Sequence, residues 1–358
     1  MKRLVVCTDG TWNSRDRAGK DGRGLTNVAK LYASVAQTDA AGVEQLPAYY
    51  PGVGTGPWWD RIVGGAFGVG VTQNIQRAYG WIVDQYEPGD ELFFFGFSRG
   101  AYTARSIVGF IRNCGILRRE HRAMIPVAYE FYRNRSPEKH PRAAAAIAFR
   151  ERYAHPGIPA LKCLGVWDTV GALGVPTTGP IGWYTRRRHG FHDVALSSWV
   201  QNAFHALAVD ERRKPFAPTI WEVADADARN PERRQRVEQT WFCGVHSNVG
   251  GGYPDARLSD LALRWMLDKA AECGLALLPD ASRYSGDCLG RLEDSMTAFY
   301  RVFGPHERAV TQPRRDGAGN PVHTFEKVAS CTLERRKKHR PPEYTPAYEP
   351  SNLRSIAD

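Results

Sequence analysis

The chain lacks any run of about eighteen apolar residues, the length that a helix needs to cross the hydrocarbon core of a bilayer. Its first apolar stretch, Leu4–Cys7, is too short for the core of a secretory signal peptide, and no small-residue cleavage site follows it. From these absences we expect no membrane span and no classical secretion. The expected location is the cytoplasm, and a signal-independent export route is compatible with the sequence.

The seven cysteines form no C-x-x-C pair and are odd in number, which argues against a zinc site and against a disulfide framework. Several lie in apolar, strand-like surroundings, where cysteine behaves as a small hydrophobic residue. The glycine-rich segments contain no G-K-[ST] ending and no G-x-G-x-x-G between a strand and a helix, so they do not predict a phosphate-binding loop. We therefore expect a reducing compartment, no metal and no cofactor.

Positive charge is in excess, with 48 Lys and Arg against 38 Asp and Glu and a formal net charge of +10. The excess is partly local, in the clusters Arg186–Arg188, Arg212–Lys214, Arg233–Arg234 and Arg335–Lys338. No segment resembles a nucleic-acid-binding module, so we expect no nucleic-acid partner. The clusters are typical either of a solvated surface or of a surface that meets an anionic partner, such as an anionic membrane.

Apolar segments rich in Val, Phe and Leu alternate with segments of helical periodicity, a pattern typical of a mostly parallel sheet with crossover helices. Strands are expected at 4–8, 45–50, 91–95, 161–167 and 239–245, and helices at 28–35, 72–86, 99–111 and 258–272. We predict one α/β-hydrolase-type domain over 1–358, with insertions at about 115–158 and 172–235. The tail, at about 301–358, is basic, rich in proline and poorly periodic.

Ser98 lies in the pattern G-x-S-x-G, directly after an apolar strand and directly before an amphipathic helix. A sharp strand-to-helix turn exposes the serine hydroxyl to substrate and to a base, and Gly96 and Gly100 let the backbone segments pass closely. The pattern alone occurs by chance fairly often. Its place between a strand and a helix favours a nucleophile over an ordinary glycine-rich turn.

A serine nucleophile needs a base and an orienting carboxylate, in the chain order Ser, Asp or Glu, His for this fold. Asp168 stands where the strand 161–167 ends, and open parallel sheets bind ligands at that edge. His246 likewise follows a strand and enters a glycine-rich loop, so we expect it to be the base. His205 is the main competitor, although its helical periodicity favours a packed or supporting histidine, and His323 in the tail is a third candidate.

The oxyanion hole requires two backbone N–H groups aimed at the developing charge. One is expected from Arg99, the residue after the nucleophile, and the other from the turn after the first strand, at Gly10 or Thr11. Asp9 precedes that turn. We expect it to orient the turn by hydrogen bonds rather than to bind a metal, because no second carboxylate stands near it at metal-ligand spacing.

Five ordered segments resemble one known family, and the likeness extends over nearly the whole chain. They are Val5–Asn13, Tyr50–Gly56, Gly96–Arg105, Val166–Gly171 and Gly244–Tyr253, with similar blocks at His205–Arg213 and Tyr348–Leu353. The family is the α/β-hydrolase domain family of formerly unknown function that includes the catalytic domain of type VI secretion phospholipase effectors. The resemblance implies Ser98, Asp168 and His246 as the triad, and it makes type VI secretion one export route to consider. The residue two positions after the histidine is often Asp in this family, whereas here it is Asn248, which keeps hydrogen bonds and removes a charge.

The expected activity is that of a serine carboxyl-ester hydrolase that releases fatty acid from glycerophospholipids through an acyl-enzyme. The lipid substrate is implied by the resemblance and not by the residues themselves. Two alternatives stay open at this point: a soluble esterase or thioesterase, and a non-catalytic binding module that keeps the hydrolase fold.

Overall fold

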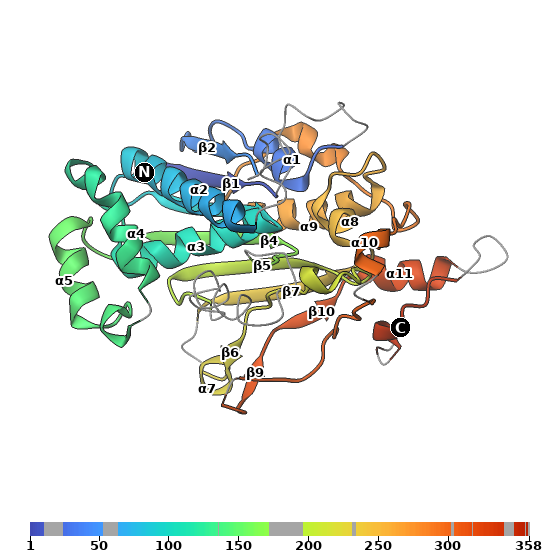
Figure 1. Ribbon diagram of the computed structural model, residues 1–358. Coiled ribbons are helices and arrows are strands. Elements are labelled where there is room, and N and C mark those ends of the chain that lie inside the picture. Colours follow the sequence, from blue (N-terminus) through green and yellow to red (C-terminus); the bar gives the residue numbers. More distant parts are fainter. Residues whose placement is uncertain are drawn as a thin grey trace.

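A parallel β-sheet organises the structure, a computed structural model that describes residues 1–10, 24–52, 64–134, 136–171, 196–230, 234–301, 304–316, 318–339, 347–354 and 356 (Figure 1). Within these ranges seven strands pair in the order β10-β7-β5-β4-β3-β1-β2, and every pairing is parallel. The strands are β1 (Arg3–Thr8), β2 (Gln45–Tyr50), β3 (Glu91–Phe97), β4 (Ala160–Trp167), β5 (Val200–Ala208), β7 (Arg236–Phe242) and β10 (Glu326–Val328). The predicted mostly parallel α/β architecture is confirmed.

Helices cover both faces of the sheet because its strands are apolar on both sides. One face packs on α2 (Gly64–Gln85), α3 (Arg99–Cys114) and α4 (Ile125–Arg133), and the other packs on α1 (Asn27–Ser34) and α9 (Arg257–Glu272). Alternate strand residues face the two layers: Phe94 packs toward α2 and α3, whereas Phe93 and Phe95 pack toward α1 and α9. None of the helices within the described ranges has the length and apolar character required to cross a bilayer.

The structure also contains shorter helices and 3-10 turns outside this core. They are η3 (Arg119–Met124), η4 (Pro137–Lys139), α5 (Ala144–Tyr153), η5 (Lys214–Phe216), α7 (Asp225–Ala228), α8 (His246–Gly250), η6 (Pro279–Arg283), α10 (Ala298–Arg301), α11 (Ser330–Lys338) and η7 (Ser351–Leu353). A separate antiparallel sheet has the order β6-β9-β8, from β6 (Val223–Ala224), β9 (Pro321–His323) and β8 (Arg314–Arg315). The predicted helical insertion at 115–158 corresponds to η3, α4, η4 and α5.

The segment around His205 differs from its prediction. It was expected to be helical and to belong to an insertion at 172–235, but Val200–Ala208 forms β5, a central strand between β4 and β7. From Ala203 to Ala208 the strand is buried on both faces, so its residues do not alternate between apolar and polar. Such a run cannot be distinguished from a buried helix by periodicity. Residues 172–195 of the predicted insertion lie outside the described residues.

The tail also contributes more than its sequence predicts. Glu326–Val328 forms β10, which extends the main sheet beside β7, and the preceding strands β8 and β9 belong to the small sheet. Strands of two or three residues are too short to show alternation, which is why the poorly periodic sequence gives no sign of them.

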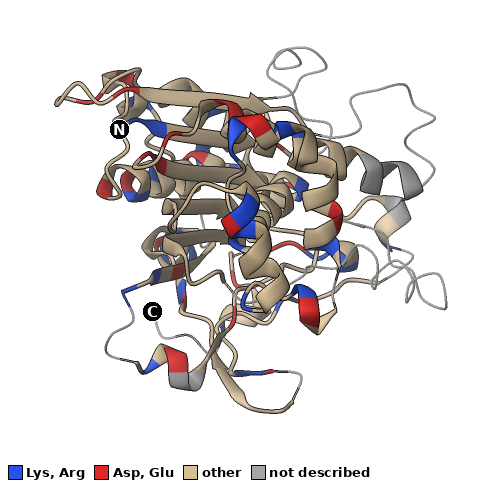
Figure 2. Cartoon of the chain, turned by 90° about the vertical axis from the view of Figure 1, so that its left-hand side faces the viewer, with Lys and Arg blue, Asp and Glu red and all other residues tan. Residues whose placement is uncertain are grey.

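Basic and acidic residues are interspersed along the elements seen in Figure 2. Two of the basic clusters have internal partners. Arg335 donates to the carbonyls of Cys288 and Gly290, and Arg213 forms an ion pair with Glu211 at 2.8 Å. Parts of the clusters at 212–214 and 335–338 therefore stabilise the fold, whereas the cluster at 186–188 and Arg233 lie outside the described residues.

Candidate active site

Three polar residues follow strands of the sheet at its carboxyl edge. Ser98 comes after β3, Asp168 after β4 and His246 after β7. The Ser98 N–H donates to the carbonyl of Trp167 at 3.0 Å, and the Asp168 N–H donates to the carbonyl of Ala206 at 2.8 Å. Ser98 and Asp168 thus continue the hydrogen bonding of their strands, whereas the His246 N–H, at the start of α8, donates to the side chain of Glu211.

Ser98 occupies a sharp turn into α3, with φ of +58° in the left-handed region that is strained for a side chain. The two flanking glycines make the turn possible. A Cβ on Gly96 would lie 2.6 Å from the Gly100 oxygen, and a Cβ on Gly100 would lie 2.5 Å from the Asp9 oxygen. Neither position has room for a side chain, which is the physical reason for the G-x-S-x-G pattern here.

Gly100→Ala is therefore expected to lower the free energy of unfolding by about 1–3 kcal/mol, because the added methyl group overpacks the contact between α3 and the end of β1. Urea unfolding followed by circular dichroism measures the change. The matched control is Gly80→Ala in α2, where a Cβ would lie 3.4 Å or more from its neighbours and alanine favours the helix. Equal destabilisation by the two substitutions would contradict this account of the turn.

The structure brings the three side chains into hydrogen-bond contact. His246 Nε2 lies 2.8 Å from Ser98 Oγ, and His246 Nδ1 lies 2.5 Å from Asp168 Oδ2. A neutral imidazole that donates from Nδ1 to the carboxylate leaves Nε2 as the acceptor for the serine O–H. Ser98 and His246 are each 5% exposed and Asp168 is fully buried, so the contacts form in a site largely shielded from water.

The carboxylate of Asp168 is held in its charged form. Burial alone would raise its pKa, but the charge of Arg308 and the hydrogen bond to His246 outweigh burial and lower the pKa well below its usual range. Burial lowers the pKa of His246, and its hydrogen bond with Asp168 only partly opposes this. At neutral pH the site thus contains an anionic aspartate and a neutral histidine.

Arg308 completes the surroundings of Asp168, and the sequence offered no signal for it. Its Nη1 lies 2.6 Å from Asp168 Oδ1 and its Nη2 lies 3.0 Å from Oδ2, a bidentate pair. The same two nitrogens also donate to the carbonyls of Ala208 and Phe216. Because Arg308 is 2% exposed and its guanidinium donates to four acceptors, it fixes the orientation of the carboxylate.

A second charged group supports the histidine loop. Glu211 Oε2 accepts from the His246 N–H at 3.2 Å, and Oε1 accepts from Ser295 and from Arg213. Burial would raise the pKa of Glu211, but the hydrogen bond from Arg213 outweighs it and lowers the pKa to about 2. Glu211 thereby ties the start of α8 to the segment after β5.

The supporting residues predicted from sequence have defined partners. His205 Nε2 accepts from the Thr169 N–H at 3.1 Å, and its Nδ1 lies 3.2 Å from Gln239 Oε1. Burial lowers the pKa of His205 to about 3, so it is a neutral residue that braces the backbone just after Asp168. Asn248 Oδ1 accepts from the N–H groups of Val245 and Glu293, and its Nδ2 donates to the carbonyl of Arg291.

The three residues predicted to supply the oxyanion N–H groups, Arg99, Gly10 and Thr11, differ in what the structure shows of them. Arg99 is the first residue of α3, whose leading N–H groups have no acceptor within the helix. The Gly10 N–H donates to Asp9 Oδ1 at 2.6 Å, so this donor is already engaged. Thr11 lies outside the described residues.

Asp9 is the centre of a small buried network. Its Oδ2 accepts from Thr26 Oγ1 and from the Tyr49 hydroxyl, both at 2.6 Å, and Thr26 in turn caps α1. Burial raises the pKa of Asp9 to about 6, although these hydrogen bonds oppose the rise. The contacts connect the end of β1 with β2 and with the residue that caps α1.

Comparison with known proteins adds a family to this geometry. The model of the family described as T6SS, phospholipase effector Tle1-like, catalytic domain, matches residues 2–269. The chain belongs to this Tle1-like catalytic-domain family. The parallel sheet with helices on both faces agrees with the α/β-hydrolase-type fold predicted from the sequence. Arg308 follows the matched segment, so the Tle1-like domain of this chain receives one of its buried charges from beyond it.

Individual relatives of the Tle1-like domain are distant. An uncharacterized protein of Saccharomyces cerevisiae is 26% identical over 234 residues, which are 60% of this chain and 32% of the relative. The chain thus spans about a third of that curated relative's length.

Among solved structures, an uncharacterized Pseudomonas aeruginosa protein is 18% identical with a TM-score of 0.49, over 84% of this chain and 50% of the other. The Tle1 effector bound to the VgrG spike of the type 6 secretion system is 20% identical with a TM-score of 0.37, over 71% and 52%. An esterase of Thermogutta terrifontis, bound to butyrate, is 14% identical with a TM-score of 0.36, over 78% and 85%.

Proposed function

We propose that the protein is a serine phospholipase that releases fatty acid from glycerophospholipids through an acyl-enzyme. The observation that carries the proposal is the continuous contact from Ser98 Oγ through His246 to Asp168. Membership of a family described as phospholipase effector catalytic domains supports a phospholipid as the substrate.

In the acylation step, Ser98 Oγ bonds to the acyl carbonyl carbon while its proton passes to His246 Nε2. Asp168 stabilises the imidazolium, and the backbone N–H of Arg99 donates to the oxyanion. The tetrahedral intermediate then collapses: the ester C–O bond breaks, and the departing lysophospholipid oxygen takes the proton from His246. Gly10 would join the oxyanion hole only after its hydrogen bond to Asp9 is broken.

In the deacylation step, His246 takes a proton from a water molecule whose oxygen attacks the acyl carbonyl. The bond to Ser98 Oγ breaks, the serine regains its proton from the imidazolium, and fatty acid leaves. The mechanism needs neither a metal nor a cofactor.

The experiment that tests the proposed substrate is a panel of glycerophospholipids with different head groups, together with short-chain esters and thioesters. Products are read by mass spectrometry, and Ser98→Ala serves as the blank. Release of fatty acid and lysophospholipid by the wild-type protein alone is the expected result. Hydrolysis of short esters or thioesters but of no phospholipid would indicate a soluble esterase or thioesterase instead. If the folded protein hydrolyses no compound of the panel, a binding module is favoured.

The pH dependence of kcat/KM gives a further prediction. The base must be neutral, and since the pKa of His246 is lowered, activity should fall only when the pH drops below about 6.5, the ordinary histidine value. A pH series with a short ester that does not itself ionise measures the midpoint.

Asp9→Asn is the matched control for that series, because Asp9 has a pKa of about 6 and lies beside the predicted oxyanion turn. If protonation of His246 causes the fall of kcat/KM at low pH, the midpoint of that fall is unchanged in Asp9→Asn. A limb that disappears with Asp9→Asn, or a midpoint at or above pH 6.5, would contradict the assignment of His246 as the base.

A further inference from the structure

Two phenylalanine rings contact the imidazole of His246. The Phe97 ring centroid lies 4.6 Å from that of the imidazole, with 34° between the ring planes. The Phe216 ring centroid lies 5.0 Å away, and its plane is nearly perpendicular at 79°. Phe97 ends β3 and is buried, whereas Phe216 ends η5 and is partly exposed. Of the two, Phe216 is therefore the ring that can shield the imidazole from solvent.

A cation and another aromatic ring hold the Phe216 ring in place. The guanidinium carbon of Arg213 lies 3.5 Å from the centroid of the Phe216 ring and 5.3 Å from that of the Tyr300 ring. Tyr300, in α10, meets Phe216 edge to face, with the ring centroids 6.0 Å apart and the planes at 89°. Cation–π and edge-to-face contacts are both attractive. The three side chains therefore form one cluster that fixes the position of the Phe216 ring.

Hydrogen bonds connect this cluster to both partners of the candidate nucleophile. The carbonyl of Phe216 accepts from Arg308, the arginine that is paired with the aspartate of the site. Arg213 donates from Nε and Nη2 to the two carboxylate oxygens of Glu211, and Glu211 accepts the N–H of His246. The Phe216 ring is thus fixed relative to the aspartate and to the histidine at once.

The charged groups that act most on His246 come from the segments after β4 and β5. Asp168 follows β4 and is itself paired with Arg308, while Glu211 and Arg213 follow β5. Burial has the largest effect on the pKa of His246 and lowers it; the hydrogen bond with Asp168 opposes burial, and the charge of Arg213 adds to the lowering. A ring that keeps water from the imidazole disfavours the imidazolium in the same way as burial does.

We propose that Phe216 is a positioning residue for the base: its ring holds the His246 imidazole in line with the serine and the aspartate and shields it from water. The inference rests on the proposed function, in which His246 takes the proton of Ser98. Rotation of the imidazole would break its contacts of 2.8 Å with Ser98 and 2.5 Å with Asp168, and the Phe216 ring restricts that rotation. Proton transfer needs a base within hydrogen-bond reach, so the ring acts on the rate through the histidine.

An NMR titration of the histidine ring signals of the full chain tests the shielding without any substrate. The signal of His246 is assigned by its loss in His246→Gln. In Phe216→Ala water reaches the imidazole, so the pKa of His246 should rise toward the ordinary value of about 6.5. Phe216→Tyr keeps the ring and should leave this pKa unchanged. The same pKa in the wild-type protein and in Phe216→Ala would contradict the proposal.

The rate at which a fluorophosphonate labels Ser98 tests the positioning, because the serine oxygen bonds to phosphorus as the base removes its proton. Phe216→Ala should lower the labelling rate about tenfold at a pH above the midpoint, since a displaced base transfers the proton more slowly. Phe216→Tyr should restore the rate to within about twofold of wild type, because it keeps the ring. Phe216→Leu, which keeps most of the apolar volume, repeats the test if Phe216→Ala does not fold.

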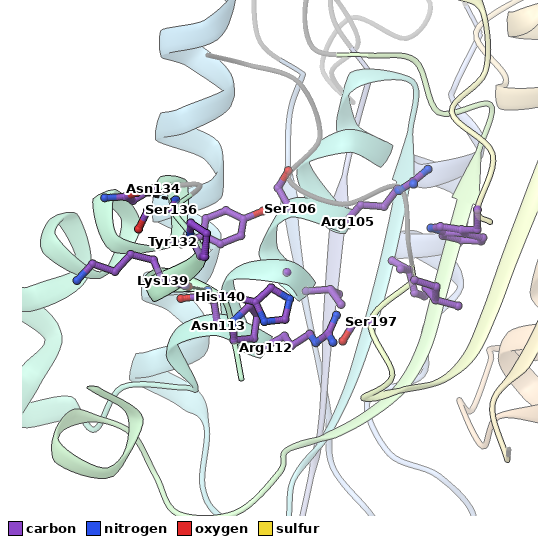
Figure 3. Close-up of a pocket in the computed structure, with 17 residues that line it drawn as sticks. Arg105, Ser106, Arg112, Asn113, Tyr132, Asn134, Ser136, Lys139, His140 and Ser197 are labelled. Carbon is purple, nitrogen blue, oxygen red and sulfur yellow. Dashed lines mark hydrogen bonds between the residues drawn. The ribbon is translucent and has the colours of Figure 1, made fainter. Parts of the chain in front are cut away.

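The matched control is Phe131→Ala, in α4. Phe131 is also a partly exposed ring beside a cation, since Lys139 Nζ lies 4.2 Å from its centroid. Lys139 is one of the residues around a cavity of about 230 Å³ along α3, and no residue of the candidate triad lines that cavity (Figure 3). Phe131→Ala should therefore leave the pKa of His246 unchanged and alter the labelling rate by less than about twofold, as expected for a distant site.

Equal changes in Phe216→Ala and Phe131→Ala would overturn the proposal, because they would show that loss of either ring acts only through the stability of the fold. Labelling of Phe216→Tyr as slow as that of Phe216→Ala would also overturn it. A folded wild-type protein that is not labelled at Ser98 would contradict the proposed function, whereas the NMR titration decides on Phe216 in either case. The role of Phe216 and the proposed activity therefore fail or stand separately.

Discussion

Replacing Ser98 by alanine is expected to lower kcat/KM for ester hydrolysis by about 10⁴-fold or more, with little change in stability. The loss is large because alanine removes the atom that bonds to the acyl carbon, and His246 then has no hydroxyl from which to take a proton. The remaining rate would come from substrate binding and from the oxyanion donors. Steady-state kinetics on the best substrate of the panel measure the loss.

His246→Gln should lower kcat/KM by a comparable factor. The double variant, Ser98→Ala with His246→Gln, should have a kcat/KM no lower than that of the less active single variant. Residues that act as one unit show this non-additivity. Thr103→Ala provides a control in α3, since its hydroxyl donates to the carbonyl of Arg99 within the helix. Losses at Ser98 and His246 that multiply would indicate that the two side chains act independently and would contradict the proposed mechanism.

Asp168→Asn is expected to lower kcat by about 10⁴-fold, because an amide in place of the carboxylate no longer stabilises the imidazolium or selects the correct tautomer. In this protein the substitution should also be costly for folding. It leaves the buried Arg308 beside a neutral amide, and loss of one partner of a buried ion pair typically destabilises by about 3–5 kcal/mol.

Arg308→Met separates the two effects. Alone it should destabilise the protein, since Asp168 loses its bidentate partner, and it should raise the pKa of Asp168. Combined with Asp168→Asn, it should restore much of the stability that either single variant loses, because no buried charge is then unpaired. Urea unfolding of the four proteins measures the coupling.

Activity should not return in the double variant, since the carboxylate is still missing. Arg308→Lys is the conservative variant for comparison, because lysine keeps the positive charge but cannot form the bidentate pair with Asp168. Stability losses that simply add in the double variant would show that Arg308 and Asp168 do not act as a pair.

Local patterns predicted the elements on which the candidate site stands. The G-x-S-x-G turn is set by short-range sterics at Gly96 and Gly100, and these act within a few residues of Ser98. The placement of Asp168 and His246 after buried strands was enough to predict that they lie at one edge of the sheet. The structure brings all three within hydrogen-bond distance.

Other parts of the site depend on contacts that no local window contains. Arg308 is one of 48 Lys and Arg residues, and only the path of the tail carries it to Asp168, 140 positions earlier in the chain. His205 was placed in a helix because β5 is buried on both faces and its sequence does not alternate. The hydrogen bond between Asp9 and the Gly10 N–H likewise depends on a side-chain conformation that residue types do not specify.

The most direct test of the central claim is covalent labelling of the folded protein with a fluorophosphonate, read by intact mass and by peptide mapping. The account predicts a single adduct on Ser98, absent in Ser98→Ala and formed much more slowly in His246→Gln. A folded protein that remains unlabelled, or an adduct on a different residue, would contradict the assignment of Ser98 as the nucleophile.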